Sequence, residues 1–350
     1  MLKLRRGRVA SLESADARVA RLTVELEDGK RRPAVAYPGL TGQVQAGDEV
    51  VVNVEAADLG LGSGGFDVVH CNLTRGLAGE GGDGHVVKLN YTSLQHAVRP
   101  LEEGHEDAPP PESIPVAVLA LHGQLPCAVF ALNALAPGAR AGYVQTGGGA
   151  LPGALSDTVA DMLERRMLAD HVSAGPSHGA PVEAITVEGA LDAGGRLGWD
   201  CALVGPGPGI LGSASALGHG GLAALANGHA ALALGSPVVV VPRVSSADPR
   251  DRHRGLSHHT ETVLRMLLRG VRVPLADGLS LPSGAALGRA VARGGHEAVG
   301  VDVSELCDAY LASGLPGGTM GRSFDEDRDF LLAALAGGAL LAQLIPDKEA

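Results

Sequence analysis

The segment richest in chemically active side chains is residues 246–260, which read SADPRDRHRGLSHHT. It follows the strongest predicted strand, Pro237–Val244, and α/β proteins place ligands at the carboxyl ends of parallel strands. Arginine offers planar donors for a phosphate or carboxylate, and an imidazole beside a bound anion can move a proton. We therefore predict that this segment binds an anionic ligand through Asp248, Arg250, Arg252, Arg254 and Ser257, with His253, His258 and His259 as catalytic residues.

The same histidines support two other interpretations. His253, His258 and His259 could ligate a metal ion together with Asp248 or Asp251. Their spacing matches no established metal motif, however, and the adjacent arginines oppose a cation. The segment could also be a loop of solvated charges before a helix that Ser257 caps. The anion-binding interpretation is preferred, and no residue is assigned as a metal ligand.

A second candidate segment, residues 201–221, reads CALVGPGPGILGSASALGHGG. An apolar strand that ends in a glycine-rich loop before a helix exposes backbone N–H groups to an anion. The GxGxxG spacing is only formally that of a dinucleotide site, because Pro206 and Pro208 remove donors and no acidic residue ends the next strand. The alternative is a turn that only packs helix on strand. The predicted ligand-binding residues here are Gly205, Gly207, Gly209, Gly212, Ser213, Ser215 and His219.

A third glycine-rich loop follows the predicted strand Ala141–Thr146, and Pro152 suits the first turn of the next helix. Glycines let the backbone turn sharply and present its N–H groups, although a tight turn without a ligand would look the same. The residues that we assign to ligand binding in this loop are Thr146, Gly147, Gly148 and Gly149. We expect the loops 146–152, 205–221 and 246–260 to form one site.

Three regions carry and position these loops. Residues 1–100 show alternating apolar and polar residues, as in Arg21–Leu26, followed by a hairpin turn at Glu27–Lys30, which predicts a small antiparallel β-barrel or sandwich. Residues 101–115 read LEEGHEDAPPPESIP and form an acidic, proline-rich linker. Residues 116–350 alternate strands with helices, which predicts a doubly wound, mainly parallel, Rossmann-like α/β domain.

The predicted elements of the α/β domain follow from its apolar periodicity. The predicted strands are Val116–Leu121, Ala141–Thr146, Ala184–Val187, Asp200–Val204, Pro237–Val244, Val271–Leu275 and Ala298–Val303. The predicted helices span residues 123–136, 151–170, 215–234, 258–269, 280–294, 304–313 and 324–344. A capping box at Ser323–Glu326 marks the expected start of the last helix.

The composition of the chain argues against some classes of function. The formal net charge of −11 opposes binding to nucleic acid or to an anionic membrane, and only 3% aromatic residues leave few surfaces for base stacking. The cysteines, Cys71, Cys127, Cys201 and Cys307, form no CxxC pair and fit a reduced interior. The first residues lack the apolar stretch of a secretory signal, so we expect a cytoplasmic protein, compatible with a homo-oligomer.

The strings TGGGALPGALS, GPGPGILGSASALGHGG and SADPRDRHRGLSHHT resemble an uncharacterised bacterial family, found chiefly in actinobacteria and firmicutes. That family carries only a domain-of-unknown-function label, and the resemblance covers nearly the whole chain. It implies no activity, substrate or cofactor. In the family the first loop often has an aspartate where Gly147 or Gly148 stands here, which weakens a catalytic role for that loop.

The function predicted from the residues is binding of a small phosphorylated or carboxylated ligand, with proton transfer by a histidine. A metal-dependent hydrolase that uses the same histidines is one alternative. A non-catalytic oligomeric or regulatory protein is the other. No cofactor is indicated by the sequence.

Overall fold

The computed structural model describes residues 1–60, 64–79, 81–82, 84–104 and 112–346. They fall into two compact units, Met1–Arg99 and Pro100–Ala350. Of the predicted linker, residues 105–111 lie outside the described residues.

The first unit contains a closed barrel with the strand order β1-β2-β3-β5-β4, in which β4 pairs back onto β1. Strand β2 shows why it forms, since every second residue of ARLTVEL is buried in the barrel interior. The prediction of a small barrel is confirmed, with one difference: β3 and β5 run parallel. The elements of this unit are β1 (Leu4–Ala15), β2 (Ala20–Leu26), β3 (Arg31–Ala36), α1 (Pro38–Thr41), β4 (Glu49–Asn53), α2 (Glu55–Asp58), β5 (Asp67–Asn72), β6 (Val86–Lys88) and β7 (His96–Val98).

The second unit is built on an eight-stranded parallel sheet in the order β11-β10-β9-β12-β8-β13-β16-β17, as expected for a Rossmann-like domain. The central strands are continuous apolar runs, because a sheet covered on both faces buries every side chain. The strands are β8 (Val116–Leu119), β9 (Ala141–Thr146), β10 (Asp170–Ser173), β11 (Val182–Glu183), β12 (Cys201–Pro206), β13 (Val238–Val241), β16 (Arg272–Ala276) and β17 (Glu297–Val301).

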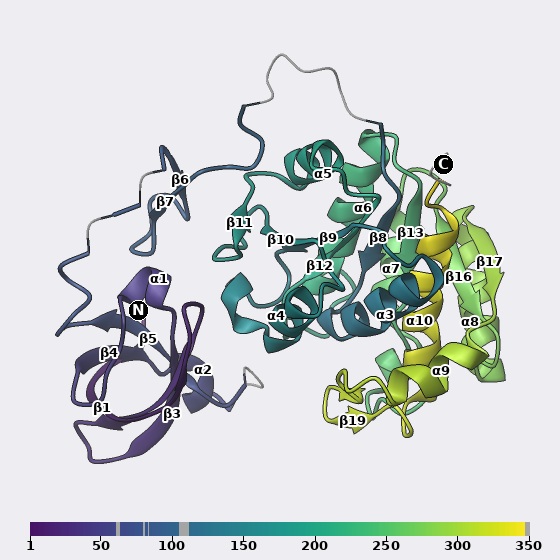
Figure 1. The fold of residues 1–350 in the computed structure, drawn as a ribbon. Coiled ribbons are helices and arrows are strands. Elements are labelled where there is room, and N and C mark those ends of the chain that lie inside the picture. The colour runs from purple at the N-terminus through teal and green to yellow at the C-terminus, as the bar shows by residue number, and fades with distance from the viewer. Residues whose placement is uncertain (61–63, 80, 83, 105–111, 347–350) are drawn as a thin grey trace. The chain divides into compact units, whose positions relative to one another are not determined.

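Two helical layers cover this sheet (Figure 1). Alternate residues of β8 mark the two faces: Ala117 and Leu119 enter one core cluster, and Val116 and Val118 enter the other. One layer holds α3 (Leu125–Leu135), α4 (Asp157–Glu164), α9 (Ser304–Leu311) and α10 (Arg328–Gln343). The other holds α5 (Val187–Arg196), α6 (Ala223–Ala233), α7 (His258–Met266) and α8 (Leu281–Gly294).

Short elements complete the loops at the carboxyl ends of the strands. Strands β14 and β15 pair with each other and close the base of the loop between β13 and α7, and β18 pairs with β19 just before α10. These elements are η1 (His122–Gln124), η2 (Gly153–Leu155), η3 (Gly220–Leu222), β14 (Val244–Ser245), η4 (Asp251–His253), β15 (Gly255–Leu256), β18 (Gly318–Thr319) and β19 (Arg322–Ser323).

Three predicted elements are wrong in part. The predicted helix 151–170 is only the short α4, because strand β10, which the sequence did not reveal, begins at its end. The predicted strand Ala184–Val187 is displaced: the strand is β11, which ends at Glu183, and α5 begins at Val187, where Thr186 caps it by accepting a hydrogen bond from the N–H of Gly189. Helix α10 begins at Arg328, one turn after the predicted capping box, although Ser323 and Glu326 do hydrogen-bond to each other.

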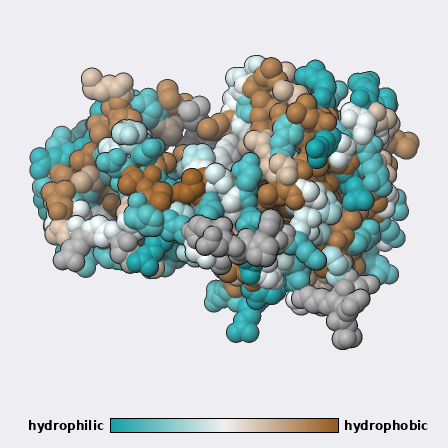
Figure 2. Space-filling view, turned by 90° about the horizontal axis from the view of Figure 1, so that it is seen from above, coloured by the Kyte–Doolittle hydropathy of each residue, from teal (hydrophilic) through white to brown (hydrophobic). Residues whose placement is uncertain are grey.

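The surface mixes hydrophilic and hydrophobic residues over the face shown in Figure 2. Single leucines such as Leu268 and Leu281 are largely exposed. Within the described ranges, no helix combines the length and the apolar character that a membrane crossing requires. The expected homo-oligomer stays a prediction.

Helices α3 and α10 approach so closely that a Cβ atom on Gly338 would overlap the backbone carbonyl of Ala128. We expect Gly338→Ala to lower the free energy of unfolding by roughly 1–3 kcal/mol, because a packed interior absorbs an added methyl group only by strain. The fluorescence of Trp199, the only tryptophan of the chain, reports urea unfolding of this unit.

The matched control is Gly288→Ala in α8, where the added Cβ meets nothing within 4 Å. There alanine should raise stability by about 0.5–1 kcal/mol, since it restricts the unfolded chain. Equal effects of the two substitutions would contradict the packing argument.

Candidate functional site

The three predicted loops meet at the carboxyl edge of the sheet. The N–H of Ala150 donates to the carbonyl of Pro208 at 2.7 Å, and the N–H of Leu211 donates to the carbonyl of Gly148 at 3.1 Å. The amide of Asn227, in α6, donates to the hydroxyl of Thr146 at 3.0 Å. Loops 146–152 and 205–221 are therefore joined directly to each other.

The close approach of loops 146–152 and 205–221 explains why glycine occupies several positions in them. Gly148 has a φ of +102°, and a Cβ on it would overlap the carbonyl of Gly220. Side chains on Gly149 and Gly207 would likewise strike the backbone of the opposite loop, and one on Gly147 would press on Pro176 at 3.2 Å. The glycines thus satisfy a close approach of two backbones, whereas an anion cradle made by them stays a prediction.

The remaining predicted residues of loop 205–221 occupy different places. Gly205 lies within β12, and Gly209 has a φ of +73°. The backbone of Gly212 pairs with that of His219 in an isolated β-bridge, which holds His219 in place. Ser213 and Ser215 are exposed and hydrogen-bond within their own turn.

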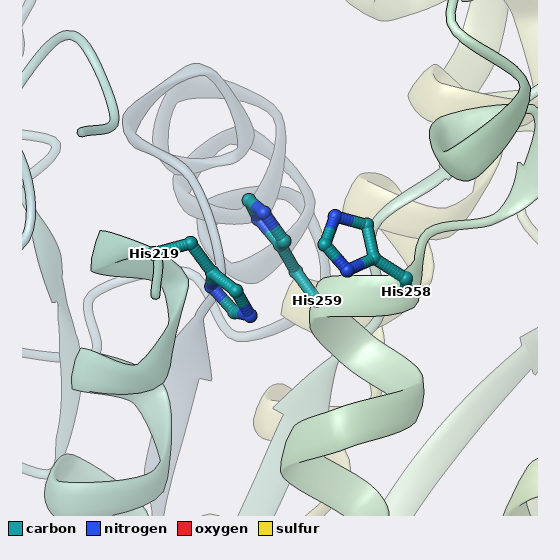
Figure 3. Close-up of side chains that lie close together, drawn as sticks. All are labelled: His219, His258 and His259. Carbon is teal, nitrogen blue, oxygen red and sulfur yellow. The ribbon is translucent and has the colours of Figure 1, made fainter. Parts of the chain in front are cut away.

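Three imidazoles converge beside this contact: His219, which precedes η3, and His258 and His259, the first two residues of α7 (Figure 3). One ring nitrogen from each lies within 4.8 Å of those of the other two. The rings of His219 and His259 stack with centroids 3.7 Å apart and 9° between their planes. His258 meets both rings edge-on. These three residues are called the histidine cluster below.

Each member of the histidine cluster has a buried nitrogen that finds no hydrogen-bond partner in the described part of the chain: His219 Nδ1, His258 Nε2 and His259 Nδ1. A Cβ on Gly221 would lie 2.8 Å from His259 Nδ1 and 3.0 Å from His219 Nδ1, so both nitrogens lie close to this glycine. His219 Nε2 lies 3.0 Å from the carbonyl of Ala216, which fixes the hydrogen on Nε2 and leaves a lone pair on Nδ1. Since a buried polar atom without a partner is costly, these nitrogens form a candidate ligand set.

The imidazoles are held neutral. Burial, followed by the charge effects of His219 and Arg243, lowers the pKa of His259 to about 2. Burial also lowers the pKa of His219 and His258. Neutral imidazole is the form that binds metal ions, so the histidine cluster is ready to act as a ligand set at neutral pH.

His253 lies next to the histidine cluster but has partners for both ring nitrogens. Its Nδ1 is 2.7 Å from the hydroxyl of Ser257, and Nε of Arg252 lies 3.4 Å from its Nε2. Its ring centroid is 4.9 Å from that of His258 and 4.8 Å from that of His259. Burial and the charge of Arg243 lower its pKa to about 3. The sequence offered His253, His258 and His259 as possible metal ligands. In the structure, the histidines whose ring nitrogens come together are His219, His258 and His259.

Ser257 is the N-cap of α7 and accepts a hydrogen bond from the N–H of His259. Its hydroxyl therefore links the start of α7 to the ring of His253. The predicted capping role is confirmed, and Ser257 also holds the imidazole of His253.

Asp248 and the arginines form a buried ionic network. The fully buried carboxylate of Asp248 binds Arg243 at 3.2 Å, Arg250 at 2.8 Å and Arg322 at 3.4 Å. Burial raises the pKa of Asp248, but the hydrogen bonds from Arg250 and the charges of Arg250 and Arg243 outweigh it and hold that pKa well below its usual range. Arg254 pairs with Asp251 at 3.4 Å and donates to the carbonyl of Asp248. Arg250 and Arg254 thus hold the loop, and Arg322 joins it from the segment before α10.

We expect the stability of the α/β unit to fall as the pH decreases from 6.5 toward 4. In this range the unfolded chain protonates His253 and His259, whereas their lowered pKa values keep them neutral in the folded chain. Each such group contributes a slope of about 1.4 kcal/mol per pH unit. Urea unfolding at several pH values, followed by the fluorescence of Trp199 in buffer with a chelator, measures this slope.

His259→Gln should reduce the pH slope, and His70→Gln, in the barrel, serves as the control. An unchanged slope in His259→Gln would show that this imidazole titrates normally in the folded chain.

The comparisons with known proteins do not name an activity. None of the curated proteins matches the chain. A family model described as "Protein of unknown function (DUF3866)" matches residues 33–338, which include β4, β5 and most of β3 in the barrel and nearly all of the α/β unit. The chain therefore belongs to this family of proteins of unknown function, DUF3866.

Proposed function

We propose that this protein is a metal-dependent hydrolase in which His219, His258 and His259 bind a divalent transition-metal ion. The observation that carries the proposal is the convergence of three neutral imidazoles, two buried and one half-buried, each of which has a buried nitrogen without a partner among the described residues. Imidazole suits zinc, cobalt, nickel and copper ions. Three protein ligands leave a position open, as catalytic sites do, and such an ion lowers the pKa of a bound water to about 7.

In this proposal the ion lies beside Gly221, because the Nδ1 atoms of His219 and His259 are within 3.0 Å of the position that a Cβ would take there. A metal–imidazole bond lies in the ring plane at about 2.0–2.1 Å. Since the two rings are stacked within 9° of parallel, one of them must turn to bring both lone pairs to a common point. Binding is therefore expected to break the stack.

His253 supports the ligand set in this proposal and does not itself move a proton. It is neutral, it lies against His258 and His259, and it is outside the ligand set. Ser257 fixes the orientation of its ring through Nδ1, and Nε of Arg252 donates to its Nε2. Because that lone pair is taken and the pKa of His253 is lowered to about 3, the ring is a weak base at neutral pH.

Cobalt binding to the full chain tests the ligand set. The chelator-treated protein should take up one Co²⁺ per chain and develop visible ligand-field absorption. His219→Gln, His258→Gln and His259→Gln should each weaken binding by more than about 100-fold, since even an outer hydrogen bond is worth roughly 10–100-fold. His229→Gln, in α6 and outside the cluster, is the control. Absence of stoichiometric Co²⁺ in a folded protein would refute the proposal and favour a non-catalytic role.

Gly221→Ala tests the position of the ion without removing a ligand. The added methyl group would occupy the space between the two Nδ1 atoms, so we expect Co²⁺ affinity to fall about tenfold or more. Gly317→Ala is the matched control, because a Cβ there meets nothing within 4 Å. If Gly221→Ala binds Co²⁺ like the wild type and retains its unfolding midpoint, the ion does not lie between these nitrogens.

A further inference from the structure

The ionic network next to the histidine cluster carries more positive than negative charge. Three guanidinium groups, Arg243, Arg250 and Arg322, share the carboxylates of Asp248 and Asp327, which leaves one positive charge in excess. Both carboxylates are buried and already hydrogen-bonded, Asp327 to the hydroxyl of Ser245 at 2.6 Å. The side chain of Arg250 is 46% exposed, so the excess charge lies at the surface of the network, where it can attract an anion.

Two of the arginines also have free donor capacity. Arg243 is only 2% exposed, yet its buried Nε has no hydrogen-bond partner among the described residues. Arg252 is exposed, and no carboxylate of the described residues lies within ion-pair distance of it; its Nε is directed at His253. Arg252 raises the local excess to two positive charges.

Both arginines act on the histidine cluster. The charge of Arg243 contributes to lowering the pKa of His219, His258 and His259, and the charge of Arg252 contributes at His258. A metal ion in the histidine cluster would add two further positive charges to this region. The protein as a whole carries a net charge of −11, so the cationic region is a local exception to an acidic molecule.

Building on the proposed metal site, we propose that its substrate is a small phosphorylated molecule whose phosphoryl group is bound by Arg243 and Arg252. A phosphate monoester carries between about −1.5 and −2 charges at neutral pH and can accept several hydrogen bonds, so it matches the excess charge and the unused donors. A carboxylate would compensate only half of that excess. Arg250 and Arg254, which the sequence also suggested, pair with Asp248 and Asp251, and unlike Arg243 neither of them has a buried nitrogen without a partner among the described residues, so we do not assign them to the phosphoryl group.

Calorimetric titration of the Co²⁺-loaded full chain with inorganic phosphate tests this assignment, with acetate at equal ionic strength as the comparison anion. We expect phosphate to bind at least about tenfold more tightly than acetate. Arg252→Gln and Arg243→Gln should each weaken phosphate binding by about tenfold or more, because a charge-assisted donor is lost. Arg254→Gln should bind phosphate like the wild type.

Arg252 is exposed, so its variant is expected to fold even if the buried Arg243→Gln does not. If the Co²⁺-loaded protein does not bind phosphate, the inference is wrong. Equal affinity for acetate, or unchanged phosphate affinity in folded Arg252→Gln, would also overturn it. A chain that binds phosphate through Arg252 but takes up no Co²⁺ would support the phosphate assignment and refute the metal site, so the two proposals fail separately.

Discussion

The carboxylate of Asp248 is the constraint on which the site depends. It is fully buried and is bound by arginines from three places: Arg243 directly after β13, Arg250 in the following loop, and Arg322 in β19. A buried carboxylate persists only when its charge is matched and its oxygens are hydrogen-bonded, and without it the guanidinium groups would repel one another. One side chain therefore joins the end of a central strand, the histidine-bearing loop and the segment before α10.

The β14–β15 ribbon supports the same loop from its base, by pairing Val244 with Leu256 and Ser245 with Gly255. Between the ribbon and Asp248 the loop has little freedom, and Ser257 starts α7 at a fixed point. The two adjacent histidines of α7 are consequently rigid, whereas His219 lies at the end of an exposed turn and approaches them from another loop. Precision of this kind is what a metal site requires of its supporting residues.

The periodicity of apolar residues was sufficient to predict the fold class. The alternation in Ala20–Leu26 fits a strand buried on one face, and the apolar run Val238–Val241 fits a strand buried on both faces. Periodicity failed at β10, whose residues DHVS are polar at both ends and are buried only because β9 and β11 lie on either side. It also did not predict the parallel β3–β5 pair that closes the barrel, since partner choice between distant strands leaves no local pattern. In the site, the sequence singled out His219, His258 and His259, but it placed His219 in an anion-binding loop, and the meeting of the three rings depends on contacts that only the folded chain makes. The same holds for the arginines, since burial and pairing decide which of their nitrogens lack a partner among the described residues.

The place of α10 in the chain has a consequence for biosynthesis. Residues Asp329–Leu341 of this helix are all buried, and the helix packs on α3 and on strands β13 and β16, yet it follows every strand of the sheet in the sequence. A ribosome adds roughly 5–20 residues per second from the N-terminus, so the apolar surface that α10 covers stays open to water until the helix emerges. The barrel can fold as soon as it is synthesised, whereas the α/β unit must complete its core in a late step, during which it is a substrate for chaperones and proteases.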